Sequence, residues 1–198
     1  MSTVYLPSPL GGMAFALCFL GWVLLEGWVN LRGWQAGSTH RDRFSRYLII
    51  VGMVLAISLA TWATGLHMFD VPSNRDMIFY GGVFLMGTGL LFRAYAIQHL
   101  GRYFVPEVLI QPNQSLVMTG PYRYIRHPSY TGTFLTVIGF GLALTNWLSL
   151  ALMVALSVPM YAFRITVEEQ AMIEAFGEEY RRYMQHSKRL IPFLLLFP

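Results

Sequence analysis

The sequence is poor in charge. Asp, Glu, Lys and Arg make up only 12% of its 198 residues, whereas hydrophobic residues make up 55%. Soluble domains carry roughly 25% charged residues. So few charged side chains cannot cover the surface of a soluble protein of this size, and so apolar a chain does not remain disordered. The apolar surplus predicts a polytopic membrane protein.

Other chemical signals are also missing. Cys18 is the only cysteine, which excludes a disulfide scaffold. The five histidines lack metal-ligand spacing, and no HExxH, GxSxG or phosphate-loop motif occurs, so we expect no metal site. Gly87-Thr88-Gly89 follows no predicted strand and is not a dinucleotide-binding motif.

Four apolar blocks are long enough to cross a bilayer, whose hydrocarbon core of about 30 Å takes roughly 20 helical residues. The last block, residues 129–163, is too long for one crossing, and Thr145-Asn146 near its middle predicts a turn. The sequence therefore predicts an all-α fold, a membrane helical bundle forming a single domain over residues 1–198. Its five transmembrane helices are expected at about 10–31, 47–67, 76–98, 127–145 and 147–164.

The basic residues predict the orientation. All of the 14 Lys and Arg residues except Arg75 fall in or next to segments on one side of the five-span arrangement. Cytoplasmic loops carry the excess of Lys and Arg, so we expect a cytoplasmic C-terminus and an N-terminus outside. The first apolar block lacks a basic leader and is expected to be a permanent helix rather than a signal peptide. The net charge of +4 then reflects topology and anionic membrane lipids, with no nucleic-acid partner.

Residues 168–189 form the most polar segment. Apolar residues recur in it at three- and four-residue spacing: Met172, Ile173, Phe176, Tyr180, Tyr183 and Met184. This spacing predicts a cytoplasmic C-terminal amphipathic helix.

A first polar cluster lies at residues 120–130. Pro128 suits the first turn of the fourth span, which places Arg126 and His127 at a helix N-terminus. Free N–H groups and the helix dipole favour an anion there, such as a carboxylate. The alternative is that these residues belong only to the basic and aromatic boundary of the membrane.

A second polar cluster contains Arg164, Glu168 and Glu169. Arg164 and Glu168 are four residues apart and share a helix face. An arginine binds a carboxylate or phosphate through two parallel hydrogen bonds, and a glutamate can accept from an amino group or a ribose. The alternative is an ordinary helix-stabilising ion pair. Glu26, near the end of the first span, is expected to reach the interface or to pair with Arg32.

Three motifs occur in order: GPYRYIRHPSYTG at 120–132, the R-x-x-x-E-E of 164–169, and FGEEYxxY at 176–183. Together they resemble the isoprenylcysteine carboxyl methyltransferase family of integral membrane enzymes. The resemblance covers about residues 98–192, which would be the cofactor-binding half. The five-span size resembles the compact prokaryotic members, which suggests a prokaryotic inner membrane.

The resemblance implies a cytoplasm-facing pocket for S-adenosyl-L-methionine and a lateral opening for a lipophilic or lipidated acceptor that enters from the bilayer. It implies that Arg164 contacts the methyl acceptor and is the catalytic residue. With the neighbouring Arg126 and Glu169, the candidate cofactor-binding residues are Gln111, Gln114, Ser115, Leu116, Val117, Tyr122, Arg126, His127, Pro128, Ser129, Tyr130, Glu168 and Glu169.

The expected reaction is methyl transfer to a lipophilic carboxylate. A carboxylate is already ionised at pH 7 and needs no general base, which fits the lack of an obvious catalytic dyad. Eukaryotic members carry a longer glutamate run than Glu168-Glu169, so an amine or thiol acceptor stays open. The alternatives are a phospholipid N-methyltransferase, a membrane reductase that uses a nicotinamide cofactor, and a non-enzymatic membrane scaffold.

Overall fold

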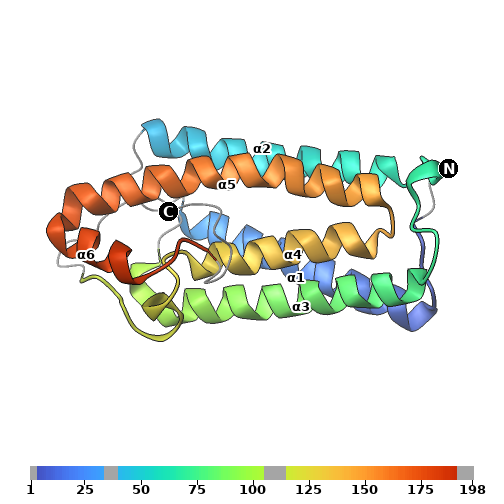
Figure 1. Cartoon of the computed structure of the whole chain (residues 1–198), viewed down its shortest axis with the longest axis horizontal. Helices are drawn as coiled ribbons and strands as arrows, with labels where there is room; N and C mark the ends of the chain where they lie inside the picture. The colour runs from blue at the N-terminus through green and yellow to red at the C-terminus, as the bar shows by residue number, and fades with distance from the viewer. Residues whose placement is uncertain (1–3, 34–39, 105–114, 191–198) are drawn as a thin grey trace.

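The protein is a bundle of long helices that run side by side and alternate in direction (Figure 1). The structure, a computed structural model, describes residues 4–33, 40–104 and 115–190. Its helices are α1 Pro9–Gly33, α2 His40–Ala63, α3 Arg75–Leu100, α4 Pro128–Ala143, α5 Trp147–Phe176 and α6 Glu178–His186. Three short 3-10 turns connect them: η1 His67–Phe69, η2 Gly101–Tyr103 and η3 Gly120–Arg123. The predicted all-α class is confirmed.

Four of the described helices are long and apolar enough to cross a membrane: Pro9–Leu31, Phe44–Ala63, Arg75–Tyr103 and Trp147–Phe176. The fifth predicted span corresponds to α4, which has only 16 residues. At 1.5 Å per residue it measures about 24 Å, less than the roughly 30 Å of a hydrocarbon core. By length and composition, the part of the chain that the structure describes therefore supports four spans.

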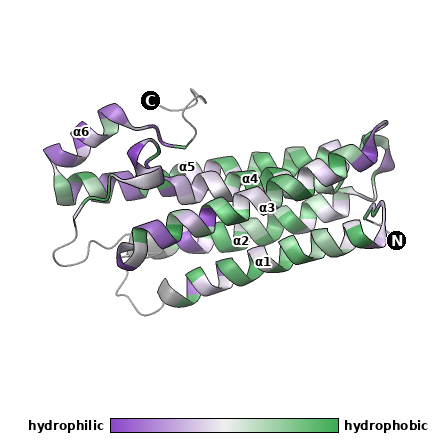
Figure 2. Cartoon of the chain, turned by 90° about the horizontal axis from the view of Figure 1, so that it is seen from below, coloured by the Kyte–Doolittle hydropathy of each residue, from purple (hydrophilic) through white to green (hydrophobic). Residues whose placement is uncertain are grey.

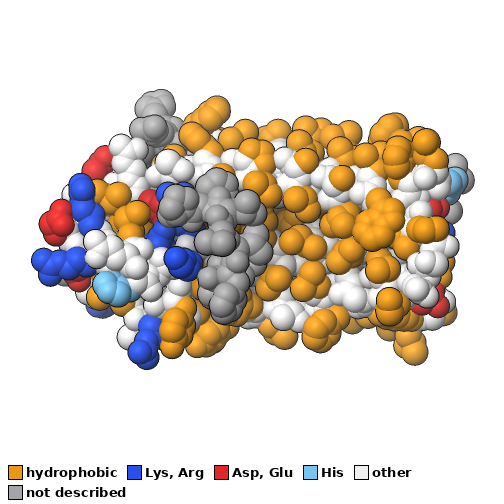
Figure 3. Space-filling model, viewed as in Figure 1, with side chains coloured by type: hydrophobic (Ala, Val, Ile, Leu, Met, Phe, Trp, Pro, Cys, Tyr) orange, Lys and Arg blue, Asp and Glu red, His pale blue; other side chains and the backbone are white. Residues whose placement is uncertain are grey.

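Hydrophobic residues cover the middle of the bundle, and hydrophilic residues gather towards its ends (Figure 2). In the space-filling view, Lys and Arg side chains lie at the end that carries α6, and the opposite end shows few charges (Figure 3). This is the distribution expected of a bundle whose sides face lipid and whose α6 end faces water.

The predicted turn at 145–146 is present. Thr145 has a positive φ of 50°, and the Asn146 side chain accepts a hydrogen bond of 3.0 Å from the Ser149 backbone N–H. An asparagine in this position satisfies a free N–H group at the start of α5. The long apolar block is therefore two helices, as the sequence predicts.

The helix predicted over 168–189 was wrong in its extent. α5 continues past residue 164 to Phe176, so Glu168 and Glu169 belong to a long membrane helix. Gly177 ends that helix with a φ of +53°, and α6 begins immediately after it. A residue without Cβ adopts this backbone conformation at little cost, which is why the chain turns here.

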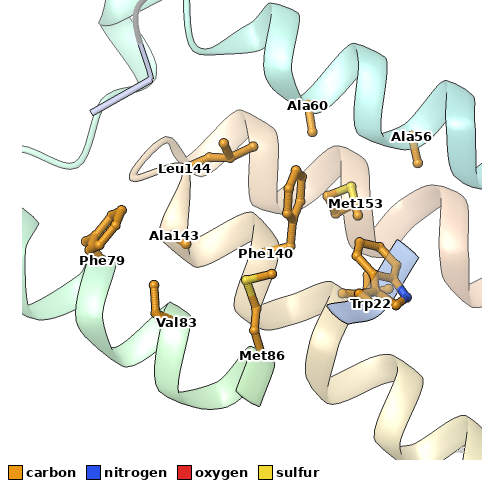
Figure 4. Close-up of a cluster of buried hydrophobic side chains, with 11 residues drawn as sticks. Trp22, Ala56, Ala60, Phe79, Val83, Met86, Phe140, Ala143, Leu144 and Met153 are labelled. Atoms are coloured by element: carbon orange, nitrogen blue, oxygen red, sulfur yellow. The ribbon is translucent and has the colours of Figure 1, made fainter. Parts of the chain in front are cut away.

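The core lies mainly between α3 and α4, with Trp22 from α1, Ala56 and Ala60 from α2 and Met153 from α5 (Figure 4). α4 packs against α1, α3 and α5, and most of its residues are buried. The fully buried side chains of this cluster include Phe79 and Met86 of α3 and Met153 of α5. The short helix α4 is therefore the interior element around which the longer helices pack.

Glycines allow α3 and α4 to approach closely. A Cβ atom on Gly82 would lie 2.5 Å from the Ala143 backbone nitrogen and 2.6 Å from the Gly139 carbonyl oxygen. A Cβ atom on Gly89 would lie 2.6 Å from the Gly132 carbonyl oxygen. Small residues at such an interface let two membrane helices approach until their backbones touch.

We expect Gly82→Ala to destabilise the bundle by roughly 1–3 kcal/mol, because the added methyl group overlaps the α4 backbone. The neighbouring substitution Gly81→Ala is the matched control, since a Cβ atom there meets nothing within 4 Å. Thermal unfolding in detergent measures both. Equal midpoints for the two variants would contradict the close packing of α3 on α4.

Candidate active site

A cavity of about 220 Å³ opens at the charged end of the bundle. It is bounded by α1 to α6 and by the segment that precedes α4. Ten of the predicted site residues line it: Ser115, Leu116, Val117, Tyr122, Arg126, His127, Ser129, Tyr130, Arg164 and Glu168. The structure thus brings together two polar clusters that lie about 40 residues apart in the sequence.

The other predicted site residues do not line the cavity or are not described. Pro128 is fully buried as the first residue of α4. Glu169 is 3% exposed and lies behind the cavity wall. Gln111 and Gln114 lie outside the described residues.

Glu168 is the polar centre of the cavity. Its carboxylate accepts a 2.8 Å hydrogen bond from Arg164 Nε and a hydrogen bond from the Tyr130 hydroxyl. His127 Nδ1 lies 3.4 Å from the second carboxylate oxygen. The predicted i, i+4 pair of Arg164 and Glu168 is therefore present, and two aromatic residues of the first cluster complete it.

The N-terminus of α4 already faces anions that the protein itself supplies. His127 precedes Pro128 and lies between the two glutamates, with Nε2 3.5 Å from Glu169 Oε1. The sequence suggested that this helix end could bind a ligand carboxylate. In the structure the carboxylates of α5 contact the His127 side chain at this helix end, and His127 connects them.

Arg126 holds the end of α6 and the residue that follows it against the bundle. Its guanidinium donates to Glu169 at 2.8 Å and to the Met184 and Ser187 carbonyl oxygens. Arg189 adds a second ion pair to Glu169 at 2.7 Å. Backbone hydrogen bonds from Arg126 to Lys188 (2.7 Å) and from His127 to Arg189 (3.0 Å) run alongside these ion pairs.

Three tyrosines close the cavity towards α6: Tyr122, Tyr180 and Tyr183. The Tyr183 hydroxyl donates to the Tyr122 carbonyl oxygen. Burial raises the pKa of Tyr183 to about 12 against the opposing charge of Arg126. Burial also raises the pKa of Tyr122 and of Tyr180. All three phenols are therefore neutral at pH 7.

The first two helices contribute residues that sequence reasoning missed. Glu26 of α1 forms an ion pair of 2.9 Å with Arg93 of α3, and both line the cavity. Asn30 and Arg46 line it next to them and are joined by a 3.3 Å hydrogen bond. The pairing with Arg32 expected for Glu26 involves a side chain outside the described residues. An arginine inside an apolar helix was the available signal, because such charges normally face a partner or a site.

α1 and α2 also supply apolar residues to the cavity lining, which we call the apolar wall. Val29 of α1 and Ile49 and Ile50 of α2 line this wall. α1 packs on α3 and α4, whereas α2 packs on α5. The wall therefore comes from two helices held by different partners.

The fold and cavity define a class of protein: a helical membrane protein with a ligand-sized, charged cavity at one end. Comparison with known proteins gives the family. The model of the isoprenylcysteine carboxyl methyltransferase (ICMT) family matches residues 82–174. The chain belongs to this family.

Individual relatives agree with this assignment. "Protein-S-isoprenylcysteine O-methyltransferase B" of Arabidopsis thaliana is 30% identical over 144 residues, which cover 72% of this chain and 73% of the relative. "Protein-S-isoprenylcysteine O-methyltransferase" of Saccharomyces cerevisiae is 36% identical over 115 residues. That match covers 57% of this chain and 48% of the yeast protein, so this chain spans about half of it.

A solved structure has a similar fold. It is that of the eukaryotic intramembrane Ras methyltransferase ICMT, with a TM-score of 0.52 and 24% sequence identity. The similarity covers 80% of this chain and 55% of the other. The helical arrangement is thus shared with a larger protein.

Glu169→Ala is expected to destabilise the protein by about 3–5 kcal/mol, since it leaves the buried Arg126 guanidinium without its carboxylate. Glu178→Ala is the control, because the Glu178 side chain is 76% exposed and its pair with Arg181 is on the surface. Thermal unfolding gives the stability difference, and trypsin cleavage within 181–189 reports release of α6. An unchanged cleavage rate in Glu169→Ala would mean that other contacts hold this segment.

Proposed function

We propose that the protein is an integral membrane methyltransferase that uses S-adenosyl-L-methionine to methylate a lipophilic carboxylate. The observation that carries this proposal is the convergence of His127, Tyr130, Arg164 and Glu168 on one cavity that also has an apolar wall. Family membership supports it, because curated relatives are named for O-methylation of S-isoprenylcysteine.

The polar residues of the cavity suit S-adenosyl-L-methionine. Glu168 offers a carboxylate to the ammonium group or the ribose hydroxyls, and it is 22% exposed. The rings of His127 and Tyr130 stack with centroids 5.8 Å apart and offer π-faces to a cationic ligand. We assign the cofactor to this end of the cavity, with Ser115, Leu116 and Val117 beside it.

When bound, the cofactor supplies an activated methyl group on a sulfonium centre. The residues of the chain then have three tasks. Arg164 orients the carboxylate of the acceptor, Glu168 fixes the cofactor, and the apolar wall excludes water. An ionised carboxylate needs no proton transfer before it attacks, so no general base is required.

The charges in the cavity favour a carboxylate acceptor over an amine. Four arginines line it, Arg46, Arg93, Arg126 and Arg164, against the two carboxylates of Glu26 and Glu168. We assign Glu168 to the cofactor, so an anionic acceptor finds a partner in Arg164, whereas a protonated amine would have to share the carboxylate that the cofactor uses. The acceptor class we propose is therefore a lipophilic acid such as an S-isoprenylcysteine.

We also propose that α1 to α5 all cross the membrane, with the short α4 held inside the bundle by its neighbours. The α6 end would face the cytoplasm, because the basic residues gather there (Figure 3). A prokaryotic inner membrane stays a prediction.

Calorimetry with S-adenosylhomocysteine tests the cofactor site. We expect binding to the purified protein in detergent, and at least about tenfold weaker binding to Glu168→Gln, because a charged hydrogen-bond acceptor is lost. Glu174→Gln is the control on the same helix, since Glu174 is exposed. Binding of NADPH without binding of S-adenosylhomocysteine would favour the reductase alternative.

Initial rates with S-isoprenylcysteine test the role of Arg164. Arg164→Lys keeps the charge but loses the paired donors, so we expect roughly a tenfold higher KM for the acceptor and an unchanged KM for the cofactor. Arg181→Lys, whose side chain is 59% exposed, serves as the control. Loss of cofactor affinity alone would instead place Arg164 at the cofactor end.

A further inference from the structure

The cavity contains a second polar layer below Arg164 and Glu168. Tyr130 of α4 contacts both of these residues, and Thr133 accepts a hydrogen bond from Arg93 Nη1. Tyr130 and Thr133 are three residues apart on α4, so the Glu26–Arg93 pair lies about one helical turn, or about 4.5 Å, deeper in the bundle.

Both members of the deeper pair have a polar atom left over. Arg93 Nη2 binds Glu26 Oε2, but Arg93 Nε and Glu26 Oε1 are buried and have no hydrogen-bond partner among the described residues. Arg93 is 4% exposed and lines the cavity, as does Glu26. The pair therefore offers one free donor and one free acceptor at the same place.

This combination selects a particular kind of group. Arg93 Nε–H requires an acceptor oxygen, and Glu26 Oε1 requires an N–H or O–H donor. A neutral group that carries both, such as an amide or a hydroxyl, satisfies the two atoms at once. Buried polar atoms without partners are uncommon in native proteins, so these two atoms are open to a polar group that enters the cavity.

The apolar wall lies beside this layer. Val29 follows Glu26 by three residues on α1, and Ile49 and Ile50 of α2 line the same cavity. A hydrocarbon chain that contacts these residues would carry its polar linkage next to Glu26 and its carboxylate one turn higher, next to Arg164.

We propose that Glu26 and Arg93 form a second acceptor subsite, which recognises a hydrogen-bonding linkage between the carboxylate and the hydrocarbon chain. This inference rests on the proposed methylation of a lipophilic acid. It distinguishes an acid with an amide or hydroxyl near the carboxylate from a simple fatty acid. An amide one carbon from a carboxylate has its oxygen about 4–5 Å from the carboxylate oxygens, which matches the separation of the two layers.

If Glu26 and Arg93 had only a structural role, replacing them would have a different effect. Glu26, Arg93 and Thr133 join α1, α3 and α4, so the pair could serve only to hold the three helices together. Replacing such a pair would then change stability and affect all ligands equally. The subsite instead predicts a change in selectivity between acids with the hydrogen-bonding linkage and acids without it.

Two matched probes test the proposal. N-dodecanoylglycine carries an amide next to its carboxylate, and pentadecanoic acid has the same chain length without it. Their dissociation constants are measured by calorimetry in one detergent for wild type, Glu26→Gln and the control Glu174→Gln. Comparing variant with wild type for each probe cancels the partitioning of that probe into micelles.

Glu26→Gln is the informative substitution because it keeps size and shape. If the glutamine oxygen pairs with Arg93, its NH₂ group replaces the free acceptor by a donor and opposes the N–H of the amide. We expect about tenfold weaker binding of N-dodecanoylglycine and less than a twofold change for pentadecanoic acid. A second variant, Glu26→Leu with Arg93→Met, removes both charges together and should give the same selectivity loss.

The outcomes separate the two proposals. Equal weakening of both probes, no change for either probe, or a fall in the thermal midpoint together with loss of both probes would overturn the subsite. Failure of S-adenosylhomocysteine to bind the wild type would overturn the proposed methyltransferase activity, while the ratio for the two amphiphiles would still report on Glu26 and Arg93.

Discussion

The polar end of this protein is organised around two consecutive glutamates of α5. Neighbouring residues on a helix point about 100° apart, so Glu168 and Glu169 face different surroundings. Glu168 faces the cavity and binds Arg164 and Tyr130, whereas Glu169 is buried against Arg126 and Arg189. His127 lies between them. The same turn of α5 thereby holds α6 against the bundle through Glu169 and supplies a carboxylate to the cavity through Glu168.

This arrangement follows from the cost of charge in an apolar chain. A charged side chain near lipid must find a partner or reach water. Here each of the three carboxylates in or next to the cavity has at least one arginine: Arg164 for Glu168, Arg126 for Glu169 and Arg93 for Glu26. The short interior helix α4 makes these pairings possible, because glycines let α3 pack directly on it and bring Arg93 to Thr133.

Local patterns predicted much of the fold and half of the site. The turn at Thr145 and the start of α4 at Pro128 depend on backbone properties of single residues, and both were confirmed. The pairing of Arg164 with Glu168 follows from helical spacing and was confirmed as well. The long-range contacts were not predictable, because nothing in the sequence relates Glu26 to Arg93, which lies 67 positions later.

The other differences from expectation have the same physical origin. Residues 168–189 were expected to form one helix, but Gly177 ends α5, and backbone hydrogen bonds of residues 126 and 127 with residues 188 and 189 hold the segment after the turn. The number of spans was inferred from length, yet α4 is buried by three neighbours and need not satisfy the length of a lipid-facing helix. Tertiary contacts decided both cases.

The two ends of the cavity come from different parts of the chain. His127, Tyr130, Arg164 and Glu168 lie within residues 82–174, which the family model matches. Glu26 and the apolar wall belong to α1 and α2, which precede that range. The residues that we assign to the cofactor therefore lie within the family match, as does Arg164 of the acceptor site, whereas Glu26 and the apolar wall of the acceptor site lie outside it. Because Arg93 lies inside the matched range and pairs with Glu26 outside it, this ion pair joins the two parts. The choice of acceptor would then depend on the first two helices, while the proposed methyl transfer would depend on the last three.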